Sequence, residues 1–560
     1  MNSKSFLMTA LLILGFIANA RTQTIQLISE TEKVKQFGLV WGLMKYHHPH
    51  VSKGQYDWDK VFVDKINELE EVKSQSELNM FLLDFVNSVE PSKIKSSTNH
   101  KGFFTKNYDY DWIEKYISSP DLYSHLSKLR DNTNIKSHYI TGHTFSSIPS
   151  FDNEKGFDNF NYTFKSHRLL SLFSFWNVIQ YYYVNKYLMD ENWVEILDKF
   201  IVKFSDCKSK FDYEKTKAHL FTHLNDSHSF YYSKELSDSL LAYKPPFGVN
   251  IINDTLVVTS VDKTLIKSKD LMLGDLIFEI DGKSIQANLD EKVKPFLSSS
   301  NDTYLKKWAN WMIFSNNKNL ELSIKRDDQI IKISLNLDNP SRTNDHSYLK
   351  PSTPTEKWKN IEDNIGYLNL KTISNDELKT AFRDFSGTKG IIIDLRNYPK
   401  NININALAKY LYREKKKFIK TISPIPNRPS LAYFDKAPLK IIKDPFIAGY
   451  HSSKYYKGKV ILLVNKTTMS QAEYIGMAIQ ASPNCITVGQ NTAGAQMNIT
   501  SYTLPDKSEI NFTSLGAFYP DGTGAQRKGL KIDYYVEETT SNFLQDQYIL
   551  KGIELINSPH

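Results

Sequence analysis

The sequence has little cysteine and lacks the short motifs that mark most metal and phosphate sites. Its two cysteines, Cys207 and Cys485, stand far apart in the chain, so they provide neither a disulfide framework nor metal-ligand spacing. No H-E-x-x-H, C-x-x-C or phosphate-binding loop occurs. In the H-H-P-H run at residues 47–50, Pro49 breaks a helix, so we expect these histidines at a solvated helix end. We predict no metal and no cofactor.

Long apolar runs are also nearly missing. One such run, residues 6–17, follows Lys4 and precedes Ala18-Asn19-Ala20, which is typical of a secretory signal peptide with its cleavage site. No cysteine follows that site, which argues against a bacterial lipid anchor. No other run approaches about 18 apolar residues, so we expect no integral membrane segment after signal removal. These features predict a secreted or periplasmic protein.

A concentrated basic surface is missing too. The formal net charge is +8, but lysines alternate with acidic residues along the whole chain. No basic stripe with interleaved aromatic residues is present, so we predict no nucleic-acid partner. The sequence carries no signal for an oligomeric state.

What the chain does have is enough apolar sequence for several cores. At 560 residues and 41% hydrophobic content, it should form a multidomain α+β protein. The expected parts are a signal peptide at 1–20, a helical region at 21–240, a β-rich domain at 241–338, a linker at 339–360, an α/β core at 361–545 and a C-terminal tail at 546–560. Within the core, the run SYTLPDKSEINFTS reads as a hairpin.

The helical region contains a weak internal duplication. The run FGLVWGLMKYHHP followed by DWDKVF is matched by LLSLFSFWNVIQYYYVNKY followed by NWVEIL. The spacing from Trp41 to Trp58 is 17 residues, and so is that from Trp176 to Trp193. We expect two related helix–loop–helix units that pack their aromatic stripes together, although an aromatic ligand groove is an alternative.

The most informative stretch is KVILLVNKTTMSQAEYIG, residues 459–476, which reads as a buried strand, a polar turn and a helix. Ser470 stands where the helix begins. Backbone N–H groups at a helix start lack intrahelical partners and lie at the positive end of the helix dipole, so they can stabilise an oxyanion. Ser470 is therefore a candidate nucleophile, and its alternative role is that of a helix N-cap.

A nucleophilic serine needs a base. The chain has no G-x-S-x-G elbow, so it is not an α/β-hydrolase of the usual type. His228, in HLNDSHSF, is a candidate base, because such groups meet in the fold rather than in the sequence. Its alternative role is that of a surface or capping histidine.

The order of these motifs resembles the C-terminal-processing (tail-specific) serine peptidase family, in its tricorn-core-like branch. The sharpest parts are Thr468-Met469-Ser470-Gln471-Ala472-Glu473 and Gly390-Ile391-Ile392-Ile393-Asp394-Leu395-Arg396, with Ser227-His228 upstream. The run LMLGDLIFEIDGKSI resembles a PDZ core, and Phe247, Gly248 and Val249 match the PDZ loop that captures a peptide terminus. The resemblance implies a C-terminal α/β core of the crotonase-like or ClpP-like type.

The resemblance also implies roles for individual residues. Ser470 is the expected nucleophile. Ala495 stands where the serine/lysine branch has its lysine base, which excludes that mechanism, and His228 becomes the expected general base. Ser227 is expected to orient the acid residue of the relay.

Two positions depart from the family pattern. Gln526 occupies the glutamate position, and glutamine cannot stabilise an imidazolium as a carboxylate does, so Asp226 and Glu473 remain open as the acid. The family's glycine-rich turn is replaced by Asn397-Tyr398-Pro399-Lys400, and Pro399 has no N–H. The oxyanion donors are then expected at Gln471 and in the turn at Tyr398.

The sequence thus predicts a secreted or periplasmic serine-type endopeptidase that hydrolyses extended polypeptides through an acyl-enzyme on Ser470. The alternative is a weak or inactive peptide- or lipid-binding protein on the same scaffold. The lost glycines and the missing carboxylate motivate that alternative.

Overall fold

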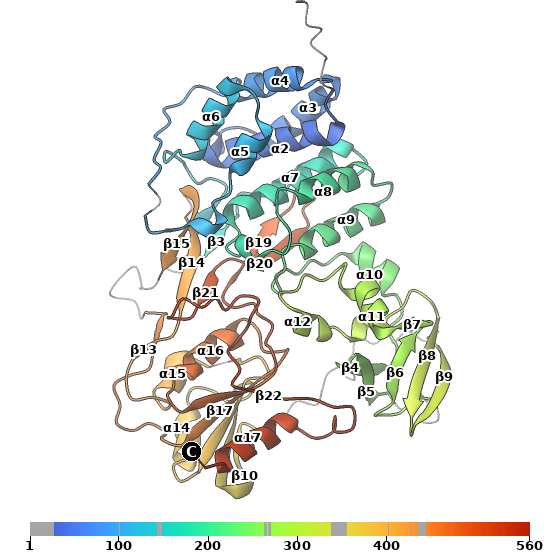
Figure 1. Cartoon of the computed structure of the whole chain (residues 1–560), viewed down its shortest axis with the longest axis vertical. Helices are drawn as coiled ribbons and strands as arrows, with labels where there is room; N and C mark the ends of the chain where they lie inside the picture. Colours follow the sequence, from blue (N-terminus) through green and yellow to red (C-terminus); the bar gives the residue numbers. More distant parts are fainter. Residues whose placement is uncertain are drawn as a thin grey trace, which may run out of the picture.

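A computed structural model describes residues 27–99, 101–142, 148–262, 266, 270–337, 356–400, 402–425, 427–434 and 444–559. The predicted signal peptide and most of the predicted linker lie outside these residues. The described chain is a mixed helical and sheet protein (Figure 1). It has several hydrophobic cores. No helix in these ranges combines the length and the apolar character needed to cross a membrane.

Helices make up most of the N-terminal region (Figure 1). They are α2 (Glu30–His47), α3 (Trp58–Glu68), α4 (Gln75–Asn87), α5 (Asp111–Tyr116), α6 (Pro120–Arg130), α7 (Lys165–Tyr182), α8 (Ile196–Ser205), α9 (Lys210–Thr222) and α10 (Lys234–Leu240). Side-chain caps start several of them; Ser74, for example, caps α4 in a capping box with Glu77.

The duplicated tryptophans form two matching pairs. Trp41 Nε1 donates to the Trp58 carbonyl at 3.0 Å, and Trp58 Nε1 donates back to the Trp41 carbonyl at 3.1 Å. Trp176 and Trp193 repeat this exchange at 2.7 and 3.0 Å. In each unit the pair ties a long central helix, α2 or α7, to the segment that follows it.

The two central helices approach each other closely. A Cβ atom on Gly42 would meet Asn177 Oδ1 at 1.8 Å, and one on Gly38 would meet the Phe173 ring at 2.1 Å. Asn177 Nδ2 donates to the Gly38 carbonyl at 3.3 Å across this contact. The aromatic stripes therefore fill a shared core, as the sequence predicts.

The H-H-P-H run is not at a solvated helix end, so that prediction is wrong. His47 and His48 are 1% and 4% exposed. Burial lowers the pKa of His47 to about 3, and its Nε2 lies 3.1 Å from the Tyr110 hydroxyl. Among the described residues, no three His, Cys, Asp or Glu side chains gather as a metal site.

The β-rich region is an antiparallel sheet in the order β4-β5-β6-β8-β9, with β7 paired to β6 (Figure 1). Its strands are β4 (Phe247–Ile252), β5 (Thr255–Val261), β6 (Leu276–Ile280), β7 (Lys283–Ser284), β8 (Asn319–Arg326) and β9 (Gln329–Asn336). Short helices accompany the sheet: α11 (Ile285–Asn288), α12 (Asp302–Lys306) and α13 (Asn310–Ile313).

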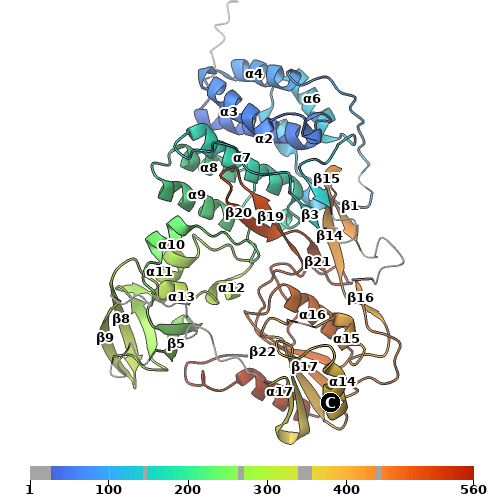
Figure 2. The ribbon, with the colours of Figure 1, turned by 180° about the vertical axis from the view of Figure 1, so that it is seen from behind.

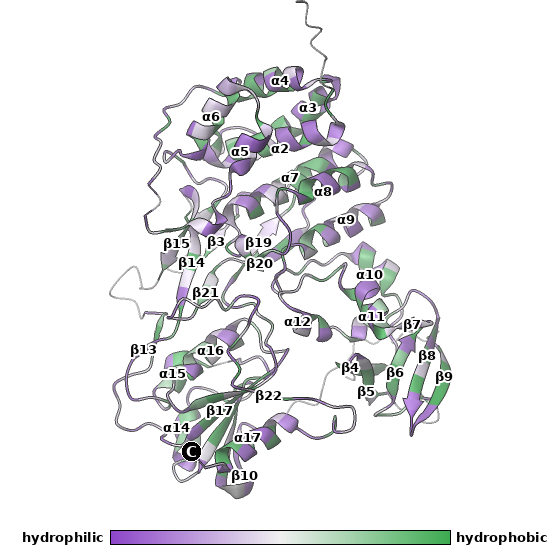
Figure 3. Cartoon of the chain, in the orientation of Figure 1, coloured by the Kyte–Doolittle hydropathy of each residue, from purple (hydrophilic) through white to green (hydrophobic). Residues whose placement is uncertain are grey.

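The C-terminal region contains a sheet in the order β10-β11-β12-β17-β18-β22, parallel except at β10. Its strands are β10 (Trp358–Ile361), β11 (Ile365–Asn369), β12 (Gly390–Asp394), β17 (Lys459–Val464), β18 (Cys485–Gly489) and β22 (Tyr534–Tyr535). The central strands consist mostly of apolar residues (Figure 3). Their side chains enter two separate cores, one on each face of the sheet, as those of buried parallel strands do.

Helices cover both faces of this sheet. One face packs against α14 (Leu378–Asp384), α15 (Ile404–Ala408) and α16 (Gln471–Gln480). The other packs against α17 (Gln547–Asn557), through Tyr548, Leu555 and Ile556. Most of the predicted C-terminal tail at 546–560 therefore forms a helix whose buried side chains complete the core on this face of the sheet.

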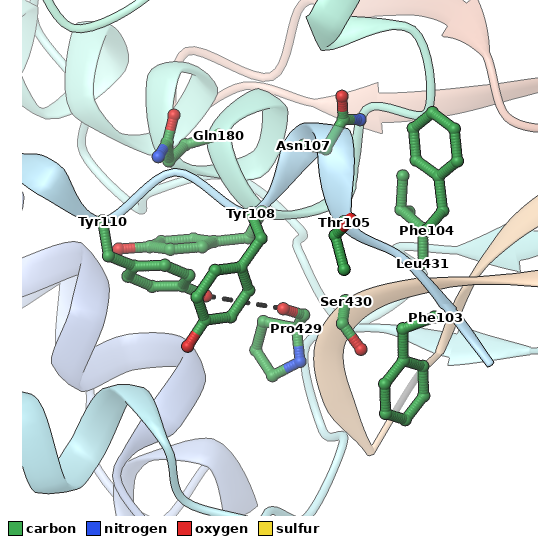
Figure 4. Close-up of a pocket in the computed structure, with 11 residues that line it drawn as sticks. Phe103, Phe104, Thr105, Asn107, Tyr108, Tyr110, Gln180, Pro429, Ser430 and Leu431 are labelled. Atoms are coloured by element: carbon green, nitrogen blue, oxygen red, sulfur yellow. Dashed lines mark hydrogen bonds between the residues drawn. The ribbon is translucent and has the colours of Figure 1, made fainter. Parts of the chain in front are cut away.

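Two further pieces join the C-terminal region to the helices (Figure 2). In one sheet, β1 (Phe103–Phe104) pairs with β15 (Arg428–Phe434), followed by β14 (Lys420–Ile425) and β21 (Gly516–Phe518). A cavity of about 20 Å³ lies at this junction, where the Tyr110 hydroxyl donates to the Pro429 carbonyl at 3.4 Å (Figure 4). The remaining short strands are β2 (Thr141–Gly142), β3 (Pro149–Ser150), β13 (Lys416–Lys417) and β16 (Ile447–Ala448).

The second piece is the predicted hairpin, which the structure confirms as β19 (Ile499–Thr503) and β20 (Glu509–Thr513). Its apolar side chains, Tyr502, Leu504, Ile510 and Phe512, belong to the core of the helical region. At its tip, Lys217 of α9 forms a buried ion pair with Asp506. The helical region therefore holds a hairpin that belongs in sequence to the C-terminal region.

Candidate active site

Ser470 lies in the turn between β17 and α16. Its backbone angles are φ 60° and ψ −120°, a conformation that L-residues rarely adopt. Thr468 Oγ1 donates to the Leu395 carbonyl at 3.0 Å and so fixes the start of the turn against β12. The Ser470 hydroxyl donates to the Met497 carbonyl at 3.4 Å. A strained strand–turn–helix junction of this kind exposes a serine hydroxyl at the edge of a sheet.

Glu473, three residues later, organises the loop that faces Ser470. Its buried carboxylate accepts hydrogen bonds from the N–H groups of Ser470, Gly494 and Ala495 at 3.3, 2.9 and 3.0 Å. Burial raises the pKa of Glu473 to about 7, although these donors oppose the shift. Glu473 thus supports the nucleophile loop, and no hydrogen bond joins it to His228 among the residues that the structure describes.

Ala495 is fully buried in this loop. Its N–H donates to Glu473, and its carbonyl accepts from Ser470 N at 2.9 Å. The position that holds a lysine base in the serine/lysine branch therefore carries a small apolar side chain and a backbone that supports the nucleophile.

His228 lies in the loop after α9 and is 8% exposed. Its backbone N–H donates to Asp226 Oδ1 at 3.0 Å, and its Nδ1 lies 2.9 Å from Thr513 Oγ1. Its Nε2 is buried and has no hydrogen-bond partner among the described residues. Burial lowers the pKa of His228, while the Asp226 carboxylate opposes that shift. The ring is therefore held at one nitrogen and free at the other.

Among the described residues, no hydrogen bond joins Ser227 to Gln526, which occupies the position of the family's acid residue. The Ser227 hydroxyl donates to the Ala493 carbonyl at 2.9 Å and accepts from Ser300 N at 2.9 Å. Gln526, which is 3% exposed, instead donates from Nε2 to Asp226 Oδ1 at 3.3 Å. Ser227 thus fastens the His228 loop to the nucleophile loop and to the β-rich region.

The base of the β19–β20 hairpin brings the two candidate residues toward each other. Ser470 contacts the Met497 carbonyl just before β19, and His228 contacts the Thr513 hydroxyl at the end of β20. Ser514 N closes the base by donating to the Asn498 carbonyl at 2.9 Å. In the described part of the chain, no hydrogen bond joins Ser470 to His228 directly. The sequence analysis missed Thr513 and Met497, because no local motif marks either residue.

The two expected oxyanion positions lie at the start of α16 and in the turn after β12. Gln471 is the first residue of α16, where a backbone N–H has no intrahelical partner. Tyr398 is 50% exposed in the turn after β12, and Thr467 Oγ1 ties that turn to the nucleophile loop through the Arg396 carbonyl. An open pocket of about 250 Å³ adjoins Gln471, with Ile402, Ile404, Pro445 and Tyr474 among its lining residues.

The predicted peptide-binding residues Phe247, Gly248 and Val249 form the first half of strand β4 rather than a free loop. Phe247 pairs with Val261 and Gly248 with Ser260. Val249 N donates to Asn310 Oδ1 at 2.9 Å. That N–H is therefore not available to capture a peptide terminus.

Comparison with known proteins identifies the C-terminal region. Residues 364–536 match peptidase family S41. The chain carries an S41 serine peptidase domain. It is 24% identical to the carboxy-terminal-processing protease of Bartonella bacilliformis over 332 residues, which cover 56% of this chain and 67% of that protein. The resemblance to C-terminal-processing peptidases is thereby confirmed.

Solved structures show a related fold. Mature CPAF aligns with a TM-score of 0.55 and 14% identity, over 70% of this chain and 96% of CPAF. CPAF complexed with lactacystin aligns with a TM-score of 0.54 and 14% identity, over 70% of this chain and 98% of that one. The similarity therefore extends beyond the S41 domain into the other regions of the chain.

Proposed function

We propose that this serine peptidase cleaves extended polypeptides with Ser470 as nucleophile and His228 as general base. One observation carries this assignment: His228 Nε2 is buried and has no hydrogen-bond partner in the described part of the chain, while Nδ1 is held by Thr513. A neutral imidazole anchored in this way offers one lone pair, and it lies beside the nucleophile loop.

The reaction follows from that arrangement. His228 Nε2 takes the hydroxyl proton as Ser470 Oγ bonds to the scissile carbonyl carbon, and the Gln471 N–H and the Tyr398 turn stabilise the oxyanion. The imidazolium then gives its proton to the leaving amine, and the C–N bond breaks. Water, deprotonated by His228, releases the acyl group and regenerates Ser470.

The neighbouring regions fit a peptide substrate. We assign the β-rich region, residues 241–338, as a PDZ-like domain, because β4 is an edge strand to which an extended peptide can add. Lys466 Nζ donates to Asn250 of β4, which links this edge to the loop that carries Ser470. We also propose a helical domain at 21–240, a crotonase-like core at 361–545 extended by α17, and export by the signal peptide at 1–20.

Labelling with a fluorophosphonate tests the nucleophile and the base. Wild type should react with one equivalent, Ser470→Ala should not react, and His228→Gln should react at least about 10²-fold more slowly. The matched controls Ser386→Ala and His451→Ala change exposed residues and should react as wild type does. Equal labelling of wild type and Ser470→Ala would refute the assignment, as would no labelling of folded wild type, which the non-catalytic binding protein predicts.

A further inference from the structure

Asp226, Thr513, His228 and Gln526 form one buried hydrogen-bond network. Thr513 Oγ1 donates to Asp226 Oδ1 at 2.9 Å, and Thr513 N donates to Asp226 Oδ2 at 2.8 Å. The Asp226 carboxylate also accepts from His228 N and from Gln526 Nε2. Thr513 and Asp226 are both fully buried. The four donors therefore hold the carboxylate in one orientation.

The hydroxyl of Thr513 fixes the direction of this network. A threonine hydroxyl has a single proton, and an ionised carboxylate can only accept. Since Thr513 gives its proton to Asp226, it can only accept from His228, so Nδ1 must carry the ring proton. The neutral ring then has its lone pair on Nε2, the nitrogen that a general base needs.

We propose that Thr513 and Asp226 act together as the positioning residues of His228, replacing the direct carboxylate that Gln526 cannot supply. This proposal rests on the proposed function of Ser470 and His228. When Nε2 takes the Ser470 proton, the hydroxyl of Thr513 strengthens its bond to Nδ1–H because its own proton lies on Asp226. No proton leaves Nδ1, and the charge on Asp226 stabilises the imidazolium through one intervening hydroxyl.

Two tyrosines near the network stay neutral at the relevant pH, and Arg527, the residue after Gln526, is paired with Asp190. Tyr183 and Tyr304 face Asp226, and burial raises the pKa of Tyr304 to about 12 and that of Tyr183 well above 10. Asp226 is therefore the charged group that acts on His228.

A substitution at Gln526 distinguishes this proposal from the family pattern, in which the acid stands at position 526. If the acid belongs at position 526, as in the family pattern, Gln526→Glu should raise the activity. If Asp226 already acts as the carboxylate of the relay, the substitution would replace the amide that donates to Asp226 with a second negative charge. We expect Gln526→Glu to react at least about tenfold more slowly, as one carboxyl of the pair becomes protonated and weakens the relay.

The central test measures the second-order rate constant of fluorophosphonate labelling as a function of pH. Thr513→Val keeps the side-chain shape and the N–H to Asp226, and it should react about 10²-fold more slowly or worse. Thr513→Ser keeps the hydroxyl and should recover most of the rate. In Asp226→Asn, the new amide can donate to Thr513 Oγ1, and the Thr513 hydroxyl can then donate to His228 Nδ1. The ring proton would move to Nε2, so the labelling rate should fall as much as in Thr513→Val.

A second measurement separates positioning from a structural role. ¹⁵N NMR of the His228 ring, recorded well below the melting temperature of each variant, should show Nδ1 protonated in wild type and in Thr513→Ser, and a mixture of tautomers in Thr513→Val. Wild-type rates in Thr513→Val, or a faster Gln526→Glu, would overturn the relay while leaving Ser470 and His228 in place. Undiminished labelling of Ser470→Ala would refute the proposed function itself.

Discussion

Thr513 Oγ1 lies 2.9 Å from His228 Nδ1, although 285 positions separate the two residues in the chain. His228 belongs to the helical region, and Thr513 ends a hairpin of the C-terminal region that is buried among those helices. The site is therefore assembled across a contact between regions, and its geometry depends on how firmly that contact is held.

The pH dependence of labelling should report the burial of His228. Burial lowers the pKa of this ring below its usual 6.5, and the base must be neutral to accept a proton. The labelling rate should be constant above about pH 6.5 and should fall about tenfold per unit below a midpoint under that value. Asp226 opposes the shift, so Asp226→Asn should move the midpoint lower still. A midpoint above 6.5 would contradict a buried histidine base.

The anchor of the hairpin should matter for both stability and activity. Lys217 is fully buried between Asp506 and Glu214, and its Nζ also donates to Ser508 Oγ at 3.1 Å. Lys217→Met leaves buried carboxylates unpaired and should cost about 3–5 kcal/mol of the free energy of unfolding. It should also slow labelling, because the displaced hairpin carries Thr513.

A neighbouring lysine provides the matched control for this measurement. Lys507 pairs with Asp158 at 3.2 Å, but both side chains are exposed. Lys507→Met should therefore change stability by less than about 1 kcal/mol in urea denaturation. Equal stability of the two variants would show that the buried ion pair does not anchor the hairpin.

The two tryptophan pairs should contribute similarly to stability. Trp41→Phe and Trp176→Phe each remove one hydrogen bond of a reciprocal pair and leave a buried carbonyl without its donor. Each should lower the free energy of unfolding by about 2–3 kcal/mol, measured by urea denaturation. A loss below about 0.5 kcal/mol at one position only would show that the two units are not equivalent.

Local patterns predicted the parts of the molecule whose contacts are close in sequence. The apolar run of β17 followed by a polar turn placed Ser470 before a helix, and turn residues around Asp506 placed the hairpin. The spacing of the tryptophans also predicted two related units. In each case the residues that contact one another are close together in the sequence.

Other features depend on burial that no local pattern reveals. His47 looks solvated beside Pro49, but α2 packs against α7 and the Tyr110 segment covers the ring. Nothing in the sequence around Thr513 distinguishes it from other threonines in strands, because its contact with His228 forms only in the folded protein. The helix α17 is different, because Tyr548, Gly552, Leu555 and Ile556 follow the i, i+4, i+7, i+8 pattern of an amphipathic helix and could have been recognised.

The hairpin held within the helical region also bears on when the peptidase becomes active. During synthesis, the chain presents His228 first, then Ser470, and only afterwards Thr513 and the hairpin tip that binds Lys217. Until the last of these segments has folded back into the first, the ring of His228 lacks its fixed tautomer. On the proposed mechanism, a partly made or partly unfolded chain therefore has no activity, and the peptidase becomes active only when the hairpin has packed against the helical region.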